Sequence, residues 1–207
     1  MKLHLNLFSP NCRKIALLVT HVNAPVEFVT VNVPAGATET PDFMKINPNG
    51  LVPALEDGEF KLWESNAIMQ YIAEKFGDKE IWPDDLKARS LISQWQFWET
   101  NHFGRAVMMI GFENFMKKAL FGEQPDQNVV ATYLDYFRIH GKVLNDQLAK
   151  SAFVLGAKPS LPDFSIAGAM QFASRAEVPL NEFPKIAQWF EKIQKLDAWK
   201  KTEPKLG

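Results

Sequence analysis

Two short stretches of the chain hold residues suited to binding a peptide-like ligand. In the first, a proline lies inside a short apolar run, Leu51-Val52-Pro53-Ala54-Leu55. In the second, an acid and a hydroxyl residue, Glu64 and Ser65, open a periodic helical pattern. Proline interrupts strand pairing, and a helix N-terminus offers unpaired N–H groups to an anion. The sequence therefore predicts a small-molecule site at these two stretches.

A third segment with reactive side chains is the turn Phe8-Ser9-Pro10-Asn11, directly before the single cysteine, Cys12. The hydroxyl of Ser9 and the amide of Asn11 can donate hydrogen bonds, although serine is also an ordinary residue of turns and helix caps. One cysteine cannot form an internal disulfide. The four histidines lack the spacing of metal ligands, so we expect no metal.

Composition limits the partners of such a site. The chain has 207 residues, 46 % of them hydrophobic, which suits one large or two small domains, and we expect two. The net charge is −1 and basic residues are interleaved with acidic ones, so we expect neither nucleic acid nor a membrane as a partner. Residues 1–7 alternate instead of forming a secretory apolar block, which together with the cysteine count predicts a cytoplasmic protein.

Periodicity predicts the elements that position these residues. Residues 3–7 alternate as in a half-buried strand, residues 15–19 show a core-facing helical pattern, and residues 26–33 are rich in valine. This order predicts a βαβ unit with two parallel strands. Two further short strands are expected around residues 53–55 and 60–63.

The rest of the chain has helical patterns. A helix should begin at Ser65 and end near Phe76, followed by a polar, proline-containing linker. Long helices are expected over residues 86–118 and 126–150. Another should start at Ser160-Leu161-Pro162-Asp163, where the acid can reach back to the amide of the capping serine.

The order and spacing of these features resemble the glutathione transferase family over essentially the whole chain. A serine near the end of the first strand is similar to the theta and phi classes. The resemblance implies an α/β plus all-α fold, with a thioredoxin-like N-terminal domain, a C-terminal helical bundle domain and a homodimer. The boundaries we expect are 1–77 for the glutathione-binding domain, 78–85 for the linker and 86–207 for the domain with the electrophile site.

The resemblance also implies the chemistry. The thiol of glutathione resembles that of free cysteine, with a pKa around 8.5, and its thiolate is the nucleophile. Ser9 would stabilise this thiolate, and Asn11 is the alternative donor. We expect thiolate attack on hydrophobic electrophiles and, as a second reaction, reduction of hydroperoxides. Glutathione would be the co-substrate, and the competing hypothesis is a non-catalytic binding or assembly module of the same fold.

Five residues should bind glutathione. Pro53 resembles the cis-proline of the family, which leaves the backbone of Val52 free to pair with the cysteinyl part, next to Leu51. Glu64 would take the ammonium of the γ-glutamyl part and Ser65 its carboxylate. The alternatives are an ordinary edge-strand proline and a plain helix cap.

The glycine end of glutathione lacks its usual partner. Relatives place a basic residue where this chain has Thr38 and Glu39, and a Lys or Gln where it has Leu51. Lys45 or a residue from elsewhere would have to substitute. We therefore expect weak contacts with the glycine carboxylate.

The electrophile should bind between the turn and the first long helix of the second domain. Aromatic rings and methionine make adaptable apolar walls, although such residues at helical spacing also form plain core. A catalytic role of Cys12 is not favoured, because the cysteine-dependent classes place their thiol nearer position 9. The candidates for the electrophile site are Phe8, His102, Phe103, Arg105, Met109 and Phe112.

Overall fold

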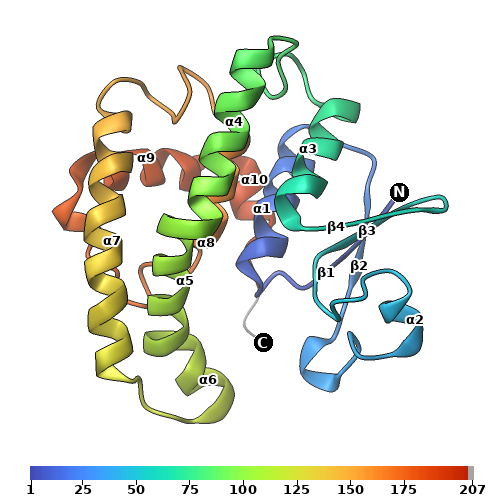
Figure 1. Ribbon diagram of the computed structural model, residues 1–207, viewed down its shortest axis with the longest axis horizontal. Helices are drawn as coiled ribbons and strands as arrows, with labels where there is room; N and C mark the ends of the chain where they lie inside the picture. Colours follow the sequence, from blue (N-terminus) through green and yellow to red (C-terminus); the bar gives the residue numbers. More distant parts are fainter. Residues whose placement is uncertain (205–207) are drawn as a thin grey trace.

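The computed structural model describes residues 1–204, and Figure 1 shows a small sheet on one side of a larger helical part. The sheet has the strand order β2-β1-β3-β4. β1 and β2 are parallel, while β3 is antiparallel to both of its neighbours. The βαβ start and the two later strands predicted from the sequence are confirmed. The strands are β1 (Lys2–Leu5), β2 (Glu27–Thr30), β3 (Ala54–Asp57) and β4 (Phe60–Trp63).

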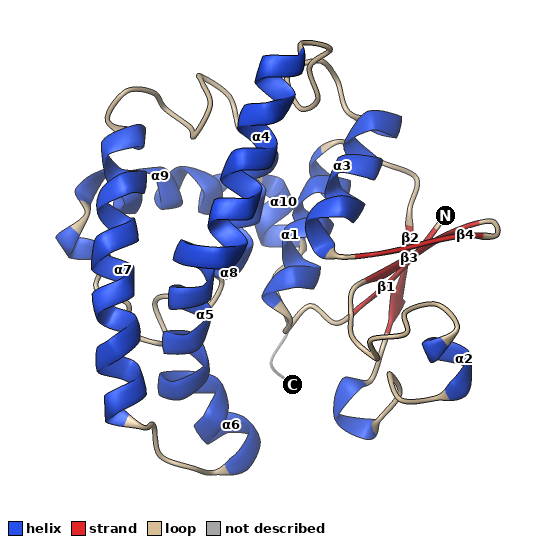
Figure 2. Ribbon diagram, viewed as in Figure 1, coloured by secondary structure: helices blue, strands red, loops and turns tan. Residues whose placement is uncertain are grey.

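Two longer helices lie between the sheet and the helical part, as Figure 2 shows. α1 (Pro10–His21) is buried on nearly all sides because it packs against both the sheet domain and α8 of the helical part. α3 (Ser65–Phe76) begins and ends where the sequence predicts. Two short pieces were not predicted, the 3₁₀ turn Val33–Ala35 and α2 (Pro41–Met44). They connect β2 to the segment before β3.

The first long helix of the second part is not a regular α-helix. It runs from residue 86 to residue 121, but two π-helical turns, Glu99–Phe103 and Phe112–Met116, interrupt it. At the first, the carboxylate of Glu99 lies inside the protein, and a Cβ on Gly104 would come within 2.2 Å of it. Its regular parts are α4 (Leu86–Trp98), α5 (Gly104–Gly111) and α6 (Lys117–Phe121).

The remaining helices complete a bundle around a core that is continuous with the sheet domain. At the start of α8, the Ser160 amide donates to Asp163 Oδ2 over 2.9 Å, as the capping prediction requires. Among residues 1–204, no helix combines the length and the apolar character needed to cross a bilayer. These helices are α7 (Gln127–Leu148), α8 (Leu161–Ala169), α9 (Pro184–Lys195) and α10 (Asp197–Lys201), with a 3₁₀ turn at Leu180–Glu182.

A buried polar network joins the two parts. Lys14 Nζ of α1 lies 3.1 Å from Glu99 Oε2, and both side chains are almost fully buried. The Ser165 hydroxyl of α8 lies 2.8 Å from both Glu99 Oε2 and Asn66 Oδ1. Asn66 in turn donates to Gln96 O of α4. Removing one member of a buried ion pair typically costs about 3–5 kcal/mol, so this network fixes α1 and α3 against the helical part.

Candidate active site

The turn before α1 positions the predicted thiolate donor. Ser9 is the N-cap of α1 in extended conformation, and its carbonyl accepts from the N–H groups of Cys12 and Arg13. Its side chain makes no capping hydrogen bond, so the hydroxyl does not serve the role of an ordinary helix cap. Gln171 of the helical part donates to Phe8 O over 2.8 Å and holds the turn from outside.

On one side of this turn lies a small cavity of about 80 Å³, which we call the asparagine cavity. It contains all five residues predicted to bind glutathione, together with Asn11. The Val52–Pro53 peptide is cis, as predicted. The cavity is lined by Asn11, Asn47, Asn49, Leu51, Val52, Pro53, Glu64 and Ser65.

The start of α3 forms one wall of the asparagine cavity. Glu64, its N-cap, has φ 71° and ψ 114°, a positive φ that non-glycine residues rarely adopt. Such backbone strain costs on the order of 1–3 kcal/mol and is often found at functional sites. The Glu64 side chain is exposed, whereas Ser65 is buried and its Oγ lies 3.5 Å from Asn11 Oδ1. An acid and a helix N-terminus therefore border the same cavity.

Two asparagines in the cavity wall were not among the predicted site residues. Asn47 Nδ2 donates to Leu51 O over 2.6 Å, and Asn47 Oδ1 accepts from the backbone amide and the side chain of Asn49. These bonds hold the loop that precedes Val52, with Gly50 at φ 63° between them. The Asn-Pro-Asn-Gly sequence was the available signal, because asparagine and glycine favour such turns.

Glu64 is the only charged residue among those that line the asparagine cavity. Lys45 does not line it, and its ammonium lies 2.7 Å from the exposed carboxylate of Asp42. Thr38 is buried and Glu39 is an acid, so neither supplies a cation. Among the described residues, the wall of the asparagine cavity thus contains no positive side chain.

A second cavity of about 200 Å³, the apolar cavity, is also lined by residues of the turn. Phe8 and Pro10 form its wall on the turn, and Phe112 contributes from the helix. Phe8 and Phe112 were both predicted for the electrophile site. The full lining is Phe8, Pro10, Val107, Met108, Gly111, Phe112, Met116, Leu120, Ala169, Phe172 and Ala173.

The other four predicted electrophile residues do not line the apolar cavity. Phe103 is fully buried and packs between Trp98 and Phe137. His102 is exposed and stacks on His140 of α7, with ring centroids 4.7 Å apart. Both side chains therefore contact other parts of the helical domain, and their electrophile-binding role stays a prediction.

Arg105 and Met109 do not line the apolar cavity either. Arg105 is exposed and Met109 is half-buried. The wall is made instead by Val107, Met108 and Gly111, because residues 100° apart on a helix face different neighbours. An electrophile-binding role of Arg105 and Met109 stays a prediction.

Cys12 has the properties of a structural residue. It is fully buried in α1, and burial raises the pKa of its thiol to about 11. Hydrogen bonds from Asn6 and Ser9 oppose this rise without cancelling it. Little thiolate would form near neutral pH, which agrees with the expectation that this cysteine is not the nucleophile.

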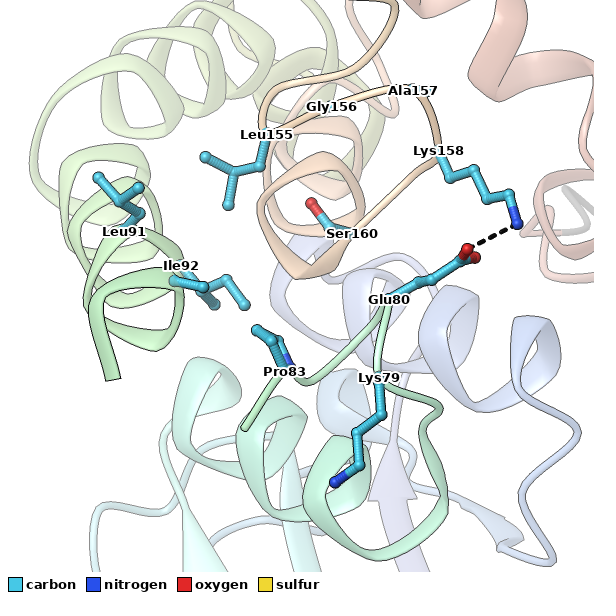
Figure 3. A pocket seen from close by; sticks show the side chains of 11 residues that line it. Lys79, Glu80, Pro83, Leu91, Ile92, Leu155, Gly156, Ala157, Lys158 and Ser160 are labelled. Atoms are coloured by element: carbon cyan, nitrogen blue, oxygen red, sulfur yellow. Dashed lines mark hydrogen bonds and ion pairs between the residues drawn. The ribbon is translucent and has the colours of Figure 1, made fainter. Parts of the chain in front are cut away.

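The largest of the three cavities, about 370 Å³, lies elsewhere (Figure 3). The linker, the start of α4 and the loop before α8 enclose it, and an ion pair of 2.7 Å between Lys158 and Glu80 closes one side. None of its lining residues belongs to the turn of residues 8–11, to the asparagine cavity or to the apolar cavity. Size alone therefore does not mark the predicted site.

Comparisons with known proteins agree with this geometry. Residues 1–74 match the family model "Glutathione S-transferase, N-terminal domain", and residues 105–197 match "Glutathione S-transferase, C-terminal domain". A glutathione S-transferase of Hyoscyamus muticus is 32 % identical, over 98 % of this chain and 97 % of that protein. Glutathione S-transferase theta-1 of Rattus norvegicus is 29 % identical, over 94 % and 82 %.

Solved structures are similar over nearly the whole chain. Glutathione transferase F7 from Populus trichocarpa has a TM-score of 0.89 and 29 % identity, covering 97 % of this chain and 96 % of that one. Glutathione S-transferase-I bound with lactoylglutathione has a TM-score of 0.89 and 25 % identity, covering 98 % and 97 %. The predicted fold and enzyme class are confirmed, and the chain belongs to the glutathione S-transferase family.

Proposed function

We propose that this chain activates glutathione at the turn of residues 8–11 and transfers it to an electrophile in the apolar cavity. The observation that carries the proposal is that residues of this turn line two different cavities. Asn11 lines the asparagine cavity, Phe8 and Pro10 line the apolar cavity, and Ser9 lies between them in the chain. A sulfur held at the turn would face the peptide site on one side and the electrophile on the other.

Ser9 is the proposed donor to the thiolate. Its hydroxyl, not engaged in capping, and the N-terminus of α1 both favour a negative sulfur. Lowering a thiol pKa by about two units requires about 2.7 kcal/mol of differential stabilisation, which one or two charge-assisted hydrogen bonds supply. The sulfur lone pair then attacks an electrophilic carbon. Asn11 remains the alternative donor because it shares the same turn.

The γ-glutamyl end would bind at the start of α3. The exposed Glu64 carboxylate would accept from the ligand ammonium, and the Ser65 hydroxyl and the free N–H groups of α3 would donate to the ligand carboxylate. The backbone at Val52 and Pro53, next to Leu51, would pair with the cysteinyl part. All of these groups line the asparagine cavity.

The test is the thiolate absorbance of bound glutathione as a function of pH. We expect Ser9→Ala to raise the pKa of the bound thiol and to lower kcat/KM near neutrality by about 10- to 100-fold, the effect of one charged hydrogen bond. Ser90→Ala, on the exposed face of α4, is the matched control. An unchanged titration in Ser9→Ala would transfer the role to Asn11.

Three further properties are proposed on the basis of the same relationship. A homodimer, a cytoplasmic location and glutathione-dependent reduction of hydroperoxides are proposed from the family resemblance. The single, buried cysteine suits a reducing compartment. Failure to retain the chain on immobilised glutathione, together with no conjugation of an aryl halide, would favour the non-catalytic module instead.

A further inference from the structure

One hydrogen bond joins the helical part directly to the backbone of the turn. Gln171 Nε2 donates to Phe8 O over 2.8 Å, across 163 positions of the sequence. Within the described part of the chain, no other hydrogen bond connects residues 8–11 to the helical part. The turn thus has a single polar attachment outside the sheet domain.

The accepting carbonyl belongs to the peptide unit that leads into Ser9. A peptide unit is planar, so the position of Phe8 O also fixes the N–H group and the Cα of Ser9. The same N–H group donates to Asn6 O over 2.9 Å, and the Ser9 carbonyl accepts from the N–H groups of Cys12 and Arg13. Both peptide units around Ser9 are therefore held in place, which leaves rotation about its side-chain bonds as the main freedom of the hydroxyl.

α8 brings Gln171 to this distance because it packs closely on the start of α1. A Cβ on Gly168 would come within 2.6 Å of Lys14 Cβ and 3.0 Å of Pro10 O, so only glycine permits this approach. At the end of α8, the Gln171 N–H group donates to Gly168 O over 3.2 Å. The side chain of Gln171 therefore extends from a backbone whose position relative to the turn is fixed.

The amide group of Gln171 is not explained by packing. Its Oε1 is buried and has no hydrogen-bond partner among residues 1–204, and a buried polar atom without a partner lowers stability. The neighbouring residues Met170, Phe172 and Ala173 are apolar. Methionine has a similar length and carries no unpaired oxygen, so the useful part of the Gln171 side chain is its N–H group.

We infer that Gln171 is a positioning residue for the reaction at the turn. The bond that it donates holds the Phe8–Ser9 peptide where the Ser9 hydroxyl can donate to the glutathione sulfur. Gln171 acts through Ser9 and not on the ligand, because it lines neither the asparagine cavity nor the apolar cavity. The inference rests on the proposed function and adds a residue of the helical part to it.

The test is the thiolate absorbance of bound glutathione in Gln171→Met as a function of pH. Without the donated bond, the Ser9 hydroxyl loses its fixed position. The pKa of the bound thiol should then rise, and kcat/KM near neutrality should fall by about three- to tenfold. Well above this pKa the thiolate forms in both proteins, so the two rates should converge. An unchanged thiol pKa, or a loss of rate that is the same at every pH, would overturn the inference.

A double-variant cycle with Ser9→Ala shows whether Gln171 acts through Ser9. In the Ser9→Ala background, Gln171→Met should leave the thiol pKa unchanged, because the hydroxyl that it positions is gone. Equal shifts in both backgrounds would contradict the inference. If Ser9→Ala alone leaves the thiol pKa unchanged, the proposed role of Ser9 is wrong and the inference fails with it. If only Ser9→Ala shifts the thiol pKa, the proposed function stands and the role of Gln171 is wrong.

A matched control separates positioning from the loss of any similar bond. Gln147 of α7 donates to Val154 O over 2.7 Å, also from a glutamine side chain to a backbone carbonyl, and lines neither cavity. Gln147→Met should leave the pKa of the bound thiol unchanged. Gln171→Leu removes the same N–H group as Gln171→Met and repeats the measurement if the methionine variant does not fold.

Binding of S-methylglutathione provides the second control. This ligand has no ionisable thiol, so its affinity for Gln171→Met should stay within about twofold of that of the wild type. If the affinity for S-methylglutathione falls as much as kcat/KM, the substitution has damaged the peptide site in general. Gln171 would then be a structural residue, and the inference would be wrong.

Discussion

Of the side chains that line the asparagine cavity, only Glu64 carries a charge. An anionic tripeptide would therefore find an acid for its ammonium, and helix N–H groups for one carboxylate. Its glycine carboxylate would meet Leu51, which is 64 % exposed, instead of a cation. Lys45, the basic residue nearest to Leu51 in the sequence, is already paired with Asp42.

The absence of a cation from the wall of the asparagine cavity predicts weak binding of the glycine end of glutathione. The wild-type chain should distinguish glutathione from γ-glutamylcysteine by less than about tenfold, that is, by less than about 1.4 kcal/mol. Leu51→Lys should strengthen binding of the full tripeptide by about 0.2–1 kcal/mol, the value of a partly exposed ion pair, and less so at high salt. Calorimetry with both ligands measures this change.

Leu51→Met is the matched control, since it keeps a long side chain without the charge. It should leave the ratio of the two affinities near that of the wild type. If the wild-type chain already prefers glutathione by more than tenfold, a cation from another part of the molecule or from a second subunit must reach the glycine carboxylate.

The peptide side of the site could be predicted because its signals are local. A proline after valine and an acid before a helix start are both visible within a few residues, and the structure brings them into one cavity. Asn47 and Asn49 were missed because their side chains act through a loop whose hydrogen bonds are not encoded by periodicity. Whether these residues bind glutathione stays a prediction.

At the scale of elements, short strands and capped helices were predicted well, and the long helix was not. Alternating polar and apolar residues predict a strand, and a capping residue predicts the start of a helix. Both patterns are formed by residues that are neighbours in the sequence. A π turn adds a residue to one turn and changes the face of every residue after it. The turn at Glu99–Phe103 accompanies a carboxylate paired with Lys14, a partner 85 positions away that no local pattern reveals.

The stacked histidines between that π turn and α7 predict a pH dependence of stability. Burial, and secondly the nearby His102, lower the pKa of His140 below its ordinary value of 6.5. As pH falls below 6.5, the unfolded chain takes up a proton that the folded chain resists. The free energy of unfolding should therefore be fully retained above 6.5 and decrease on acidification.

Urea unfolding from about pH 7.5 to about pH 5 tests this. His140→Gln should flatten the dependence, because glutamine does not titrate. Part of the pH dependence should remain because burial also lowers the pKa of His21. The double variant His21→Gln/His140→Gln should therefore show a still weaker dependence of stability on pH. A wild-type stability that rises on acidification, or a slope unaffected by His140→Gln, would contradict the assignment.

At the scale of the whole molecule, the two parts meet through α1 and α3. Arg13 of α1 lies over the ring of Trp199, 3.8 Å from its centroid, and Asn66 of α3 donates to the backbone of α4. Two exposed aromatic residues lie close in the sequence to the residues of this second contact. Trp63, 41 % exposed, directly precedes Glu64, and Phe97, 69 % exposed, directly follows Gln96.

Exposed aromatic residues of this size, one on the edge strand β4 and one on α4, suit a protein interface. We therefore expect the proposed homodimer to form across β4 and α4, next to the asparagine cavity. Light scattering after size exclusion should give twice the chain mass for the wild type. Phe97→Glu should shift the chain toward the monomer, because an unpaired charge at an interface centre is costly.

The control is Ile139→Glu, an equally exposed apolar position on α7, in the helical part away from the sheet (Figure 1). It should leave the mass of the wild type unchanged. If the dimer persists in Phe97→Glu and is lost in Ile139→Glu, the interface lies on α7. A second subunit near Glu64 could supply the cation that the glycine carboxylate lacks. In that case, dissociation of the dimer by Phe97→Glu should weaken the binding of glutathione more than the binding of γ-glutamylcysteine. Equal weakening of both ligands would show that the second subunit does not bind the glycine end.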